Sequence, residues 1–244
     1  MPKVSDLKIK IFADGADLDG ILEMYANPLI QGFTTNPTLM RKAGITDYEI
    51  FARQVLAEVK DRPVSFEVFA DDFDGMERQA LQIASWGPNV NIKIPVTNTK
   101  GESACPLIER LSGQGIVVNV TAIMTLDQVR EVAAALAPET GAIVSVFAGR
   151  VADTGVDPVP HMTQALEILS EKPKAELLWA SPRELLNIFQ ADAIGCHIIT
   201  VTNDVLGKLK LVGKDLDAYS RETVEMFYRD ATAAGYGIET PAAA

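Results

Sequence analysis

Eight short segments rich in β-branched and apolar residues recur along the chain, and stretches with helical periodicity separate them. They start about 21 to 33 residues apart, which is the length of one strand plus one crossover helix. The helical stretches include residues 47–60, 74–86, 126–137, 159–169 and 182–190, the last with Pro182 in its first turn. The predicted strands span residues 8–15, 32–37, 63–70, 89–96, 115–122, 142–149, 175–181 and 196–202.

Strict alternation of strand and helix predicts a parallel sheet, either open or closed into a barrel. Eight repeats in 244 residues match the count of a (β/α)8 barrel. The sequence has no glycine-rich nucleotide-binding motif after any predicted strand, and no linker or shift in composition. We therefore predict an α/β fold, a single (β/α)8 TIM barrel domain over residues 1–244, with a C-terminal helix and a short tail at about residues 236–244.

Charge and cysteine content limit the partners and the compartment. The formal net charge of −11 comes from 33 acidic and 22 basic residues without a basic patch, so we expect no nucleic-acid partner. The sequence has no apolar run near the ~20 residues of a membrane span and no secretory signal in residues 1–10, so we expect no membrane partner. Cys105 and Cys196 fit a reduced, cytoplasmic chain better than a disulfide framework.

Polar residues occupy alternate positions along several predicted strands. Because side chains alternate across a strand, Ile92 and Ile94 should face the helices while Lys93 faces the barrel interior. An unpaired buried polar group costs ~1–3 kcal/mol, so packing alone does not explain inward polar residues on seven strands. Since barrel active sites form at the carboxyl ends of the strands, we predict a site there that includes Asp14, Asn36, Glu67, Lys93, Asn119, Thr121, Ser145 and Ser181.

Lys93 is the expected centre of this site. Burial in mid-strand favours the neutral amine, which is a nucleophile toward carbonyl groups and forms Schiff bases. Glu67 and Asp14 are candidate proton carriers. The alternative is that Lys93 forms a structural ion pair with Glu67 or extends its amine to solvent.

Two arginines follow the sixth and seventh predicted strands. A phosphate group could be bound there through charge-assisted hydrogen bonds from Arg150, Arg183 and Ser181. The alternative is that the two arginines form salt bridges at the barrel rim. His161 and His197 lack neighbours at metal-ligand spacing, so we expect no metal ion. An imine is then the expected electron sink.

Six short runs resemble the transaldolase family, in order and on suitable strands. They are TTNP from Thr34, FEV from Phe66, IKIPVT from Ile92, NVT from Asn119, SVFAGR from Ser145 and ASPR from Ala180. The chain length resembles the short-chain members, which are fructose 6-phosphate aldolases and small transaldolases. The resemblance implies a metal-independent class I mechanism without a cofactor, acting on small sugar phosphates in carbohydrate metabolism, with the pentose phosphate pathway as its obvious setting.

The resemblance also implies a role for each residue. Lys93 would form the imine, Glu67 would shuttle protons through a water held by Thr121, and Asp14 would take the proton of the C4 hydroxyl. The donor hydroxyls and the phosphate would be bound by Asn36, Asn119, Ser145, Arg150, Ser181 and Arg183. In short-chain relatives a C-terminal helix packs on a neighbouring subunit, which implies a homo-oligomer, a pentamer or decamer, formed here by residues 215–234 with Met226, Phe227 and Tyr228 as contacts.

Two positions separate the activities within the family. Its aldolases tend to carry Gln and Tyr where this chain has Glu67 and Phe147, so both residues resemble the transferase version. The expected reaction is transfer of a dihydroxyacetone unit from a ketose phosphate, such as fructose 6-phosphate or sedoheptulose 7-phosphate, to an aldose phosphate. One alternative is an aldolase that releases free dihydroxyacetone and glyceraldehyde 3-phosphate, and the other is a non-catalytic sugar-phosphate-binding barrel.

Overall fold

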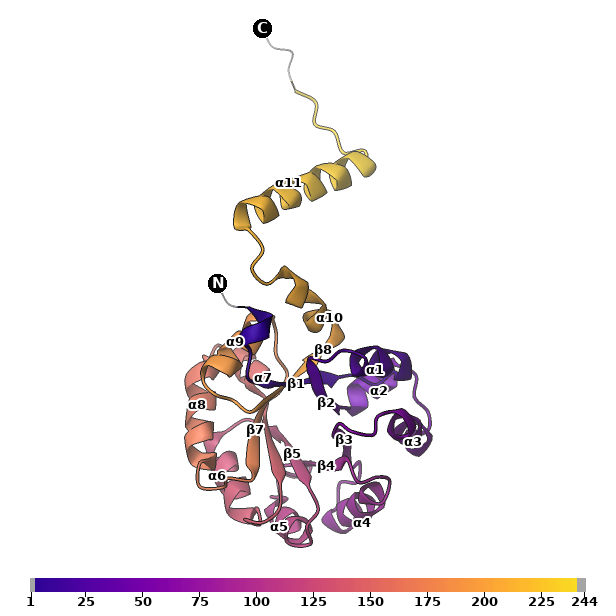
Figure 1. Ribbon diagram of the computed structural model, residues 1–244, viewed down its shortest axis with the longest axis vertical. Coiled ribbons are helices and arrows are strands. Elements are labelled where there is room, and N and C mark those ends of the chain that lie inside the picture. Colours follow the sequence, from indigo (N-terminus) through magenta and orange to yellow (C-terminus); the bar gives the residue numbers. More distant parts are fainter. Residues whose placement is uncertain (1–2, 241–244) are drawn as a thin grey trace. The chain divides into compact units, whose positions relative to one another are not determined.

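Eight parallel strands form one closed barrel in chain order, and β8 pairs with β1 to complete it (Figure 1). The computed structural model describes residues 3–240, of which residues 7–208 form the compact unit that holds the barrel. The strands are β1 (Lys10–Asp14), β2 (Ile30–Thr34), β3 (Val64–Glu67), β4 (Val90–Pro95), β5 (Val118–Ile123), β6 (Ala142–Val146), β7 (Ala175–Trp179) and β8 (Ile198–Thr202). The predicted (β/α)8 fold is confirmed.

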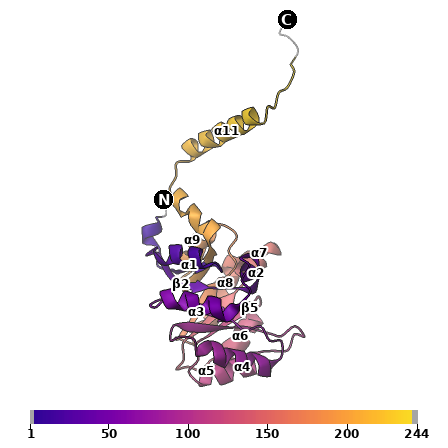
Figure 2. The same ribbon diagram turned by 90° about the vertical axis from the view of Figure 1, so that its right-hand side faces the viewer.

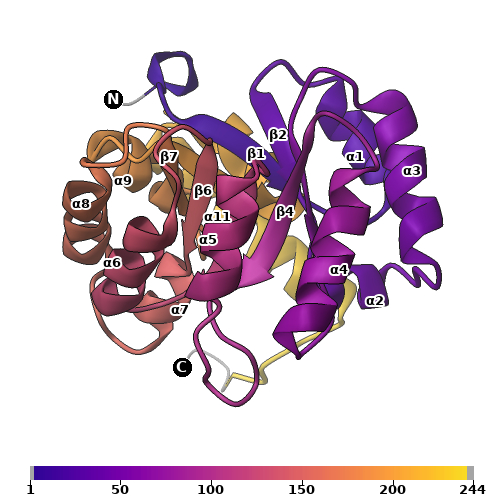
Figure 3. The ribbon, with the colours of Figure 1, turned by 90° about the horizontal axis from the view of Figure 1, so that it is seen from below.

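Helices follow the strands and surround the barrel (Figure 3). Side chains at the N-caps of α1, α2, α3, α4, α6 and α8 each accept a hydrogen bond from a backbone N–H group of the first turn. The helices are α1 (Leu18–Tyr25), α2 (Pro37–Lys42), α3 (Tyr48–Glu58), α4 (Phe73–Ala84), α5 (Cys105–Gly113), α6 (Leu126–Ala135), α7 (Ala148–Asp153), α8 (Pro158–Leu169), α9 (Leu186–Ala193) and α10 (Asn203–Leu206).

Two predicted boundaries are wrong where the chain leaves a strand for the site. The strand predicted at 32–37 ends at Thr34, because Asn36 caps α2 by accepting a hydrogen bond from the Leu39 N–H at 2.9 Å. Pro182 lies outside the helix predicted to start there, since α9 begins at Leu186. Ser181 turns the chain with a φ of 61°, and the Asn187 side chain accepts the Arg183 N–H at 2.8 Å.

Apolar layers position the site within the barrel. The outward residues of β3, β4 and β5, such as Phe66, Ile92 and Val120, are buried against the helices. Residues from β1, β6, β8 and from β7 with the position after it form a buried apolar cluster, made of Phe12, Ile143, Leu178, Ala180 and Ile198. At Gly32 the ring of Phe12 approaches so closely that a Cβ there would lie 2.5 Å from it. The polar residues therefore gather at the carboxyl ends of the strands.

The described residues outside the barrel unit, 3–6 and 209–240, form a unit of their own. It contains a 3-10 turn, η1 (Val4–Asp6), and α11 (Leu216–Ala233), which Figure 2 shows as one unbroken helix at the position predicted for residues 215–234. A second 3-10 turn, η2 (Gly207–Leu211), spans the junction between the units. Of the tail predicted at 236–244, residues 241–244 lie outside the described residues.

Within residues 3–240, no helix combines the length and apolar character that crossing a bilayer requires.

Candidate active site

A cavity of about 660 Å³ opens at the carboxyl ends of the strands, and every strand or the loop after it contributes to its wall. The structure brings all eleven predicted site residues to this cavity. They are Asp14, Asn36, Glu67, Lys93, Asn119, Thr121, Ser145, Phe147, Arg150, Ser181 and Arg183. A space of this size holds a small-molecule ligand.

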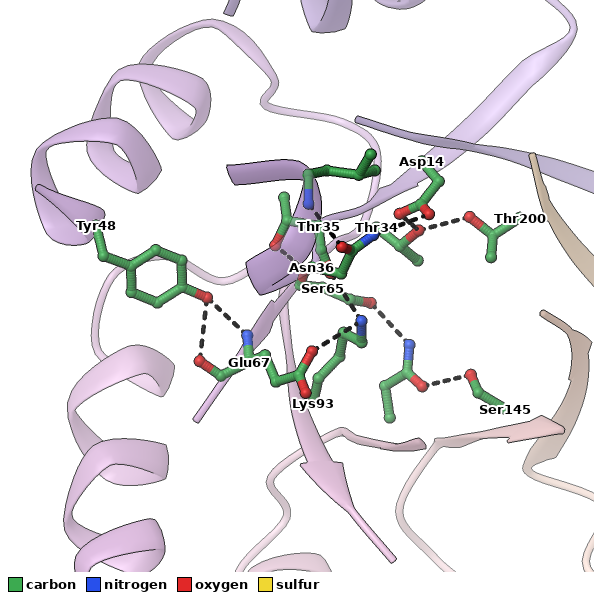
Figure 4. A network of polar contacts seen from close by, with 12 residues as sticks. Asp14, Thr34, Thr35, Asn36, Tyr48, Ser65, Glu67, Lys93, Ser145 and Thr200 are labelled. Carbon is green, nitrogen blue, oxygen red and sulfur yellow. Dashed lines mark hydrogen bonds and ion pairs between the residues drawn. The ribbon is translucent and has the colours of Figure 1, made fainter. Parts of the chain in front are cut away.

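The amine of Lys93 is held by two oxygen atoms inside the barrel. Its Nζ donates a hydrogen bond of 2.7 Å to the Thr35 carbonyl and lies 3.1 Å from Glu67 Oε2 (Figure 4). The register of β3 against β4 pairs Glu67 with Lys93, which explains why the two side chains lie at one level. Lys93 is only 7% exposed, so its position is fixed before any ligand binds. The ion pair considered as an alternative is present in the unliganded site.

Asp14 forms a separate acidic centre at the end of β1. Thr34 Oγ1 donates to one carboxylate oxygen at 2.8 Å, and Asn36 Nδ2 donates to the other at 3.1 Å. Burial raises the pKa of Asp14 above its ordinary value of 3.8, although the charge of Lys93 and both hydrogen bonds act in the opposite direction. A carboxyl group with a raised pKa is suited to accept and return a proton near neutral pH.

Buried hydrogen bonds order the polar groups beside Lys93. Asn119 Nδ2 donates to Ser65 Oγ at 3.1 Å, and Ser145 Oγ donates to Asn119 Oδ1 at 2.6 Å (Figure 4). This network uses one of the two N–H groups of the Asn119 amide. The second one and the Ser145 oxygen are therefore available to a hydroxyl group bound in the cavity.

Cationic groups line the rim after β6 and β7. Arg183 Nε donates to Asp153 Oδ1 at 2.9 Å, and Arg183 Nη1 donates to Ser181 Oγ at 3.0 Å. Arg150 lies 5.6 Å from the centre of the Phe147 ring. The backbone at Gly149 packs directly against the loop after β7. A Cβ at Gly149 would lie only 1.6 Å from the Ser181 carbonyl oxygen. The rim salt bridge considered for Arg183 is thus present, yet Arg183 still lines the cavity.

Sequence reasoning missed several polar residues that support the site. Thr200 Oγ1 lies 2.5 Å from Thr34 Oγ1 and completes the chain of hydroxyl groups that ends on Asp14. Strand parity could have identified Thr200, because it alternates with Ile199 and Val201 along β8. Asp153 had no comparable signal, since it lies at the end of α7 and reaches Arg183 in the loop after β7.

Comparisons with known proteins identify the family of this chain. The family model described as Transaldolase/Fructose-6-phosphate aldolase matches residues 11–240. A probable transaldolase of Methanococcus maripaludis is 35% identical over 203 residues, covering 82% of this chain and 89% of the relative. A probable transaldolase of Thermoanaerobacter is 37% identical over 200 residues, covering 81% and 88%.

Solved structures share the fold at much lower identity. The crystal structure of 3-hexulose-6-phosphate synthase has a TM-score of 0.56 at 15% identity, covering 82% of this chain and 92% of that one. The structure of 2,3-dimethylmalate lyase has a TM-score of 0.57 at 15% identity, covering 98% and 89%. At this identity the likeness concerns the fold alone.

Proposed function

The chain belongs to the transaldolase/fructose-6-phosphate aldolase family, and we propose that it transfers a dihydroxyacetone unit from a ketose phosphate to an aldose phosphate through a Schiff base on Lys93. Membership of the family makes it an enzyme of the transaldolase/aldolase type. The observation that carries the finer proposal is the buried Lys93 amine, 3.1 Å from the Glu67 carboxylate, in a cavity that also contains Asp14 and two arginines.

The first half of the reaction forms the imine. The neutral Lys93 amine attacks the C2 carbonyl of the ketose, and the resulting carbinolamine loses its C2 hydroxyl as water. Glu67 accepts the proton that leaves the amine and delivers a proton to the departing hydroxyl, with Thr121 orienting a water between them. The placement of Glu67 beside the Lys93 nitrogen supports this role.

The second half breaks one carbon–carbon bond and makes another. Asp14 accepts the proton of the C4 hydroxyl, the C3–C4 bond breaks, and the electron pair moves into the imine as an enamine. The aldose phosphate leaves, and the enamine carbon then attacks the aldehyde of an acceptor while Asp14 returns the proton. Hydrolysis of the new imine releases the product ketose and restores the amine.

The phosphate and hydroxyl groups of the sugar need fixed partners. Arg150, Arg183 and Ser181 line the rim and are proposed to bind the phosphate by charge-assisted hydrogen bonds. Asn36, Asn119 and Ser145 are proposed to bind the donor hydroxyls. Asn119 and Ser145 are pre-ordered by their own hydrogen bonds, which lowers the entropy lost on binding.

Trapping of the imine tests the proposal. The protein is treated with fructose 6-phosphate and borohydride, digested, and analysed by mass spectrometry. We expect a reduced three-carbon adduct on Lys93, absent from Lys93→Met and retained in Lys10→Met, since Lys10 pairs with Glu176 away from the cavity. A folded wild-type protein without an adduct would overturn the proposal and favour a binding-only barrel.

A substitution at Phe147 distinguishes the proposed transferase activity from the alternative aldolase activity. Phe147 lines the cavity and has no hydroxyl group to deliver a proton to the enamine. We therefore expect Phe147→Tyr to increase release of free dihydroxyacetone when no acceptor is present. The measurement is the ratio of free dihydroxyacetone to transfer product, and an unchanged ratio contradicts the assignment. Substantial release by the wild-type protein would instead favour the aldolase.

A further inference from the structure

Tyr48, the first residue of α3, directs its phenol group onto the backbone of Glu67. The hydroxyl oxygen accepts a hydrogen bond from the Glu67 N–H at 2.7 Å and donates one to the Glu67 carbonyl at 3.1 Å (Figure 4). Tyr48 does not line the active-site cavity. Both hydrogen bonds connect Tyr48 to the reacting groups through Glu67, and the Thr35 side chain also contacts the phenol.

The Tyr48 phenol lies beside Glu67 at the position where β2 no longer pairs with β3. Val68 donates its N–H to the Lys93 carbonyl on the β4 side, so the backbone groups of Glu67 point the other way, toward β2. There the β2–β3 pairing ends at Thr34 and Ser65, and the chain turns at Asn36 into α2. The hydroxyl of Tyr48 supplies the one donor and one acceptor that a continuing strand would have offered.

The ring of Tyr48 is itself held on several sides. It packs at 6.0 Å from Phe66, 4.6 Å from Phe69 and 5.7 Å from Trp86, measured between ring centres. Burial raises the pKa of the Tyr48 phenol above its ordinary value of 10.0, so the group stays protonated and keeps its donor at physiological pH. The contact is therefore a fixed support and is not a proton relay.

We propose that Tyr48 is a positioning residue, which fixes the Glu67 peptide and thereby holds the Glu67 carboxylate at the Lys93 amine. The inference rests on the proposed function, because it gives Glu67 the proton transfers of imine formation. Glu67 is the last residue of β3, so only one side of its peptide is tied into the barrel by strand pairing. Without the phenol, we expect the carboxylate to sample positions away from Lys93.

A double-mutant cycle of Tyr48→Phe and Glu67→Gln tests the proposal. The readout is the rate at which borohydride traps the adduct on Lys93. We expect Tyr48→Phe to slow trapping roughly tenfold in the wild-type background, because small displacements of a catalytic group are costly. In the Glu67→Gln background the same substitution should have no further effect. Equal effects in both backgrounds, or no effect in a folded Tyr48→Phe protein, would overturn the inference.

Tyr25→Phe is the matched control, because the Tyr25 hydroxyl also donates one hydrogen bond, to Asp61 at 2.7 Å, outside the cavity. Its trapping rate should equal that of the wild type. If Glu67→Gln alone leaves the rate unchanged, then the role given to Glu67 is wrong and the inference fails with it, while the Lys93 imine stands.

A second readout separates positioning from a purely structural role. Tyr48 does not line the cavity, so Tyr48→Phe should slow trapping at saturating fructose 6-phosphate and leave the KM for this sugar unchanged. A raised KM with an unchanged maximal rate would overturn the inference.

Discussion

The carboxyl group of Asp14 binds its proton more tightly in the folded protein than in an unfolded chain, because burial raises its pKa above 3.8. The unfolding free energy therefore falls as pH rises through the interval between 3.8 and the raised value, since the folded state holds the extra proton there. Each unit of increase costs ~1.4 kcal/mol at higher pH. The Asn side chain carries no charge, so Asp14→Asn should be more stable than the wild type near pH 7 and inactive in transfer.

Thermal unfolding between pH 4 and 8 checks this prediction. The difference in Tm between Asp14→Asn and wild type should grow with pH by about 3–6 °C for each unit of raised pKa and then level off. Asp61 gives the opposite case, because its hydrogen bond from Tyr25 lowers its pKa. The stabilising effect of Asp61 is acquired as pH rises through the interval that ends near 3.8, so the Tm difference for Asp61→Asn should stay level from about pH 5 to 8. A Tm difference for Asp14→Asn that is independent of pH would contradict the argument.

Residues on strands could be predicted individually, whereas Tyr48 and Asp153, which act from helices, could not. Parity alone directed Lys93 and Glu67 into the barrel, and the register of β3 and β4 then brought them together. Tyr48 and Asp153 reach the site from α3 and α7, and their contacts depend on how each helix packs on the strands. That packing is a tertiary property, which no spacing in the sequence encodes.

The turn that begins α7 positions the rim residues that are proposed to bind the phosphate. Its Gly149 leaves no room for a side chain, since a Cβ would lie 1.6 Å from the Ser181 carbonyl oxygen. Gly149→Ala must therefore separate α7 from the loop after β7, and with it Arg150 from Ser181 and Arg183. We expect kcat/KM for fructose 6-phosphate to fall at least tenfold, with a stability loss of about 1–3 kcal/mol.

Comparison with a sugar that lacks the phosphate isolates the effect on the rim. The ratio of kcat/KM for fructose 6-phosphate over fructose should decrease in Gly149→Ala. Gly113→Ala serves as the control, because a Cβ at this position at the end of α5 meets nothing within 4 Å. If the ratio is unchanged while the protein is destabilised, Gly149 serves folding alone.

Strand and helix order followed directly from periodicity, whereas the boundaries near the site did not. The interior of each strand is set by burial on both faces, which leaves a clear apolar pattern. The ends are set by local hydrogen bonds, such as the Asn36 cap of α2 and the Asn187 contact after Ser181. The residues proposed to bind the substrate lie at these strand ends. Hydrophobic periodicity therefore predicts the loops of the site least well.

Self-association has to overcome the charge of the whole molecule. With a net charge of −11, two copies repel one another, and a stable oligomer therefore needs a large apolar contact. The described residues of its own unit bury none of α11. At about 100° per residue, Leu216, Tyr219, Met226 and Phe227 fall on one face of the helix, whereas Tyr228 points away from that face. We propose that this face packs on a neighbouring copy of the chain.

Phe227→Glu should disrupt that packing, because it places a negative charge on the apolar face. We expect sedimentation velocity at about 10 µM to show an oligomer for the wild type and a shift toward monomer for the variant. Arg229→Gln changes the net charge by the same amount on the same helix and should leave the mass unchanged, which separates loss of apolar contact from added repulsion. A monomeric wild type, or a Phe227→Glu protein with the wild-type mass, would show that this face of α11 does not hold the subunits together.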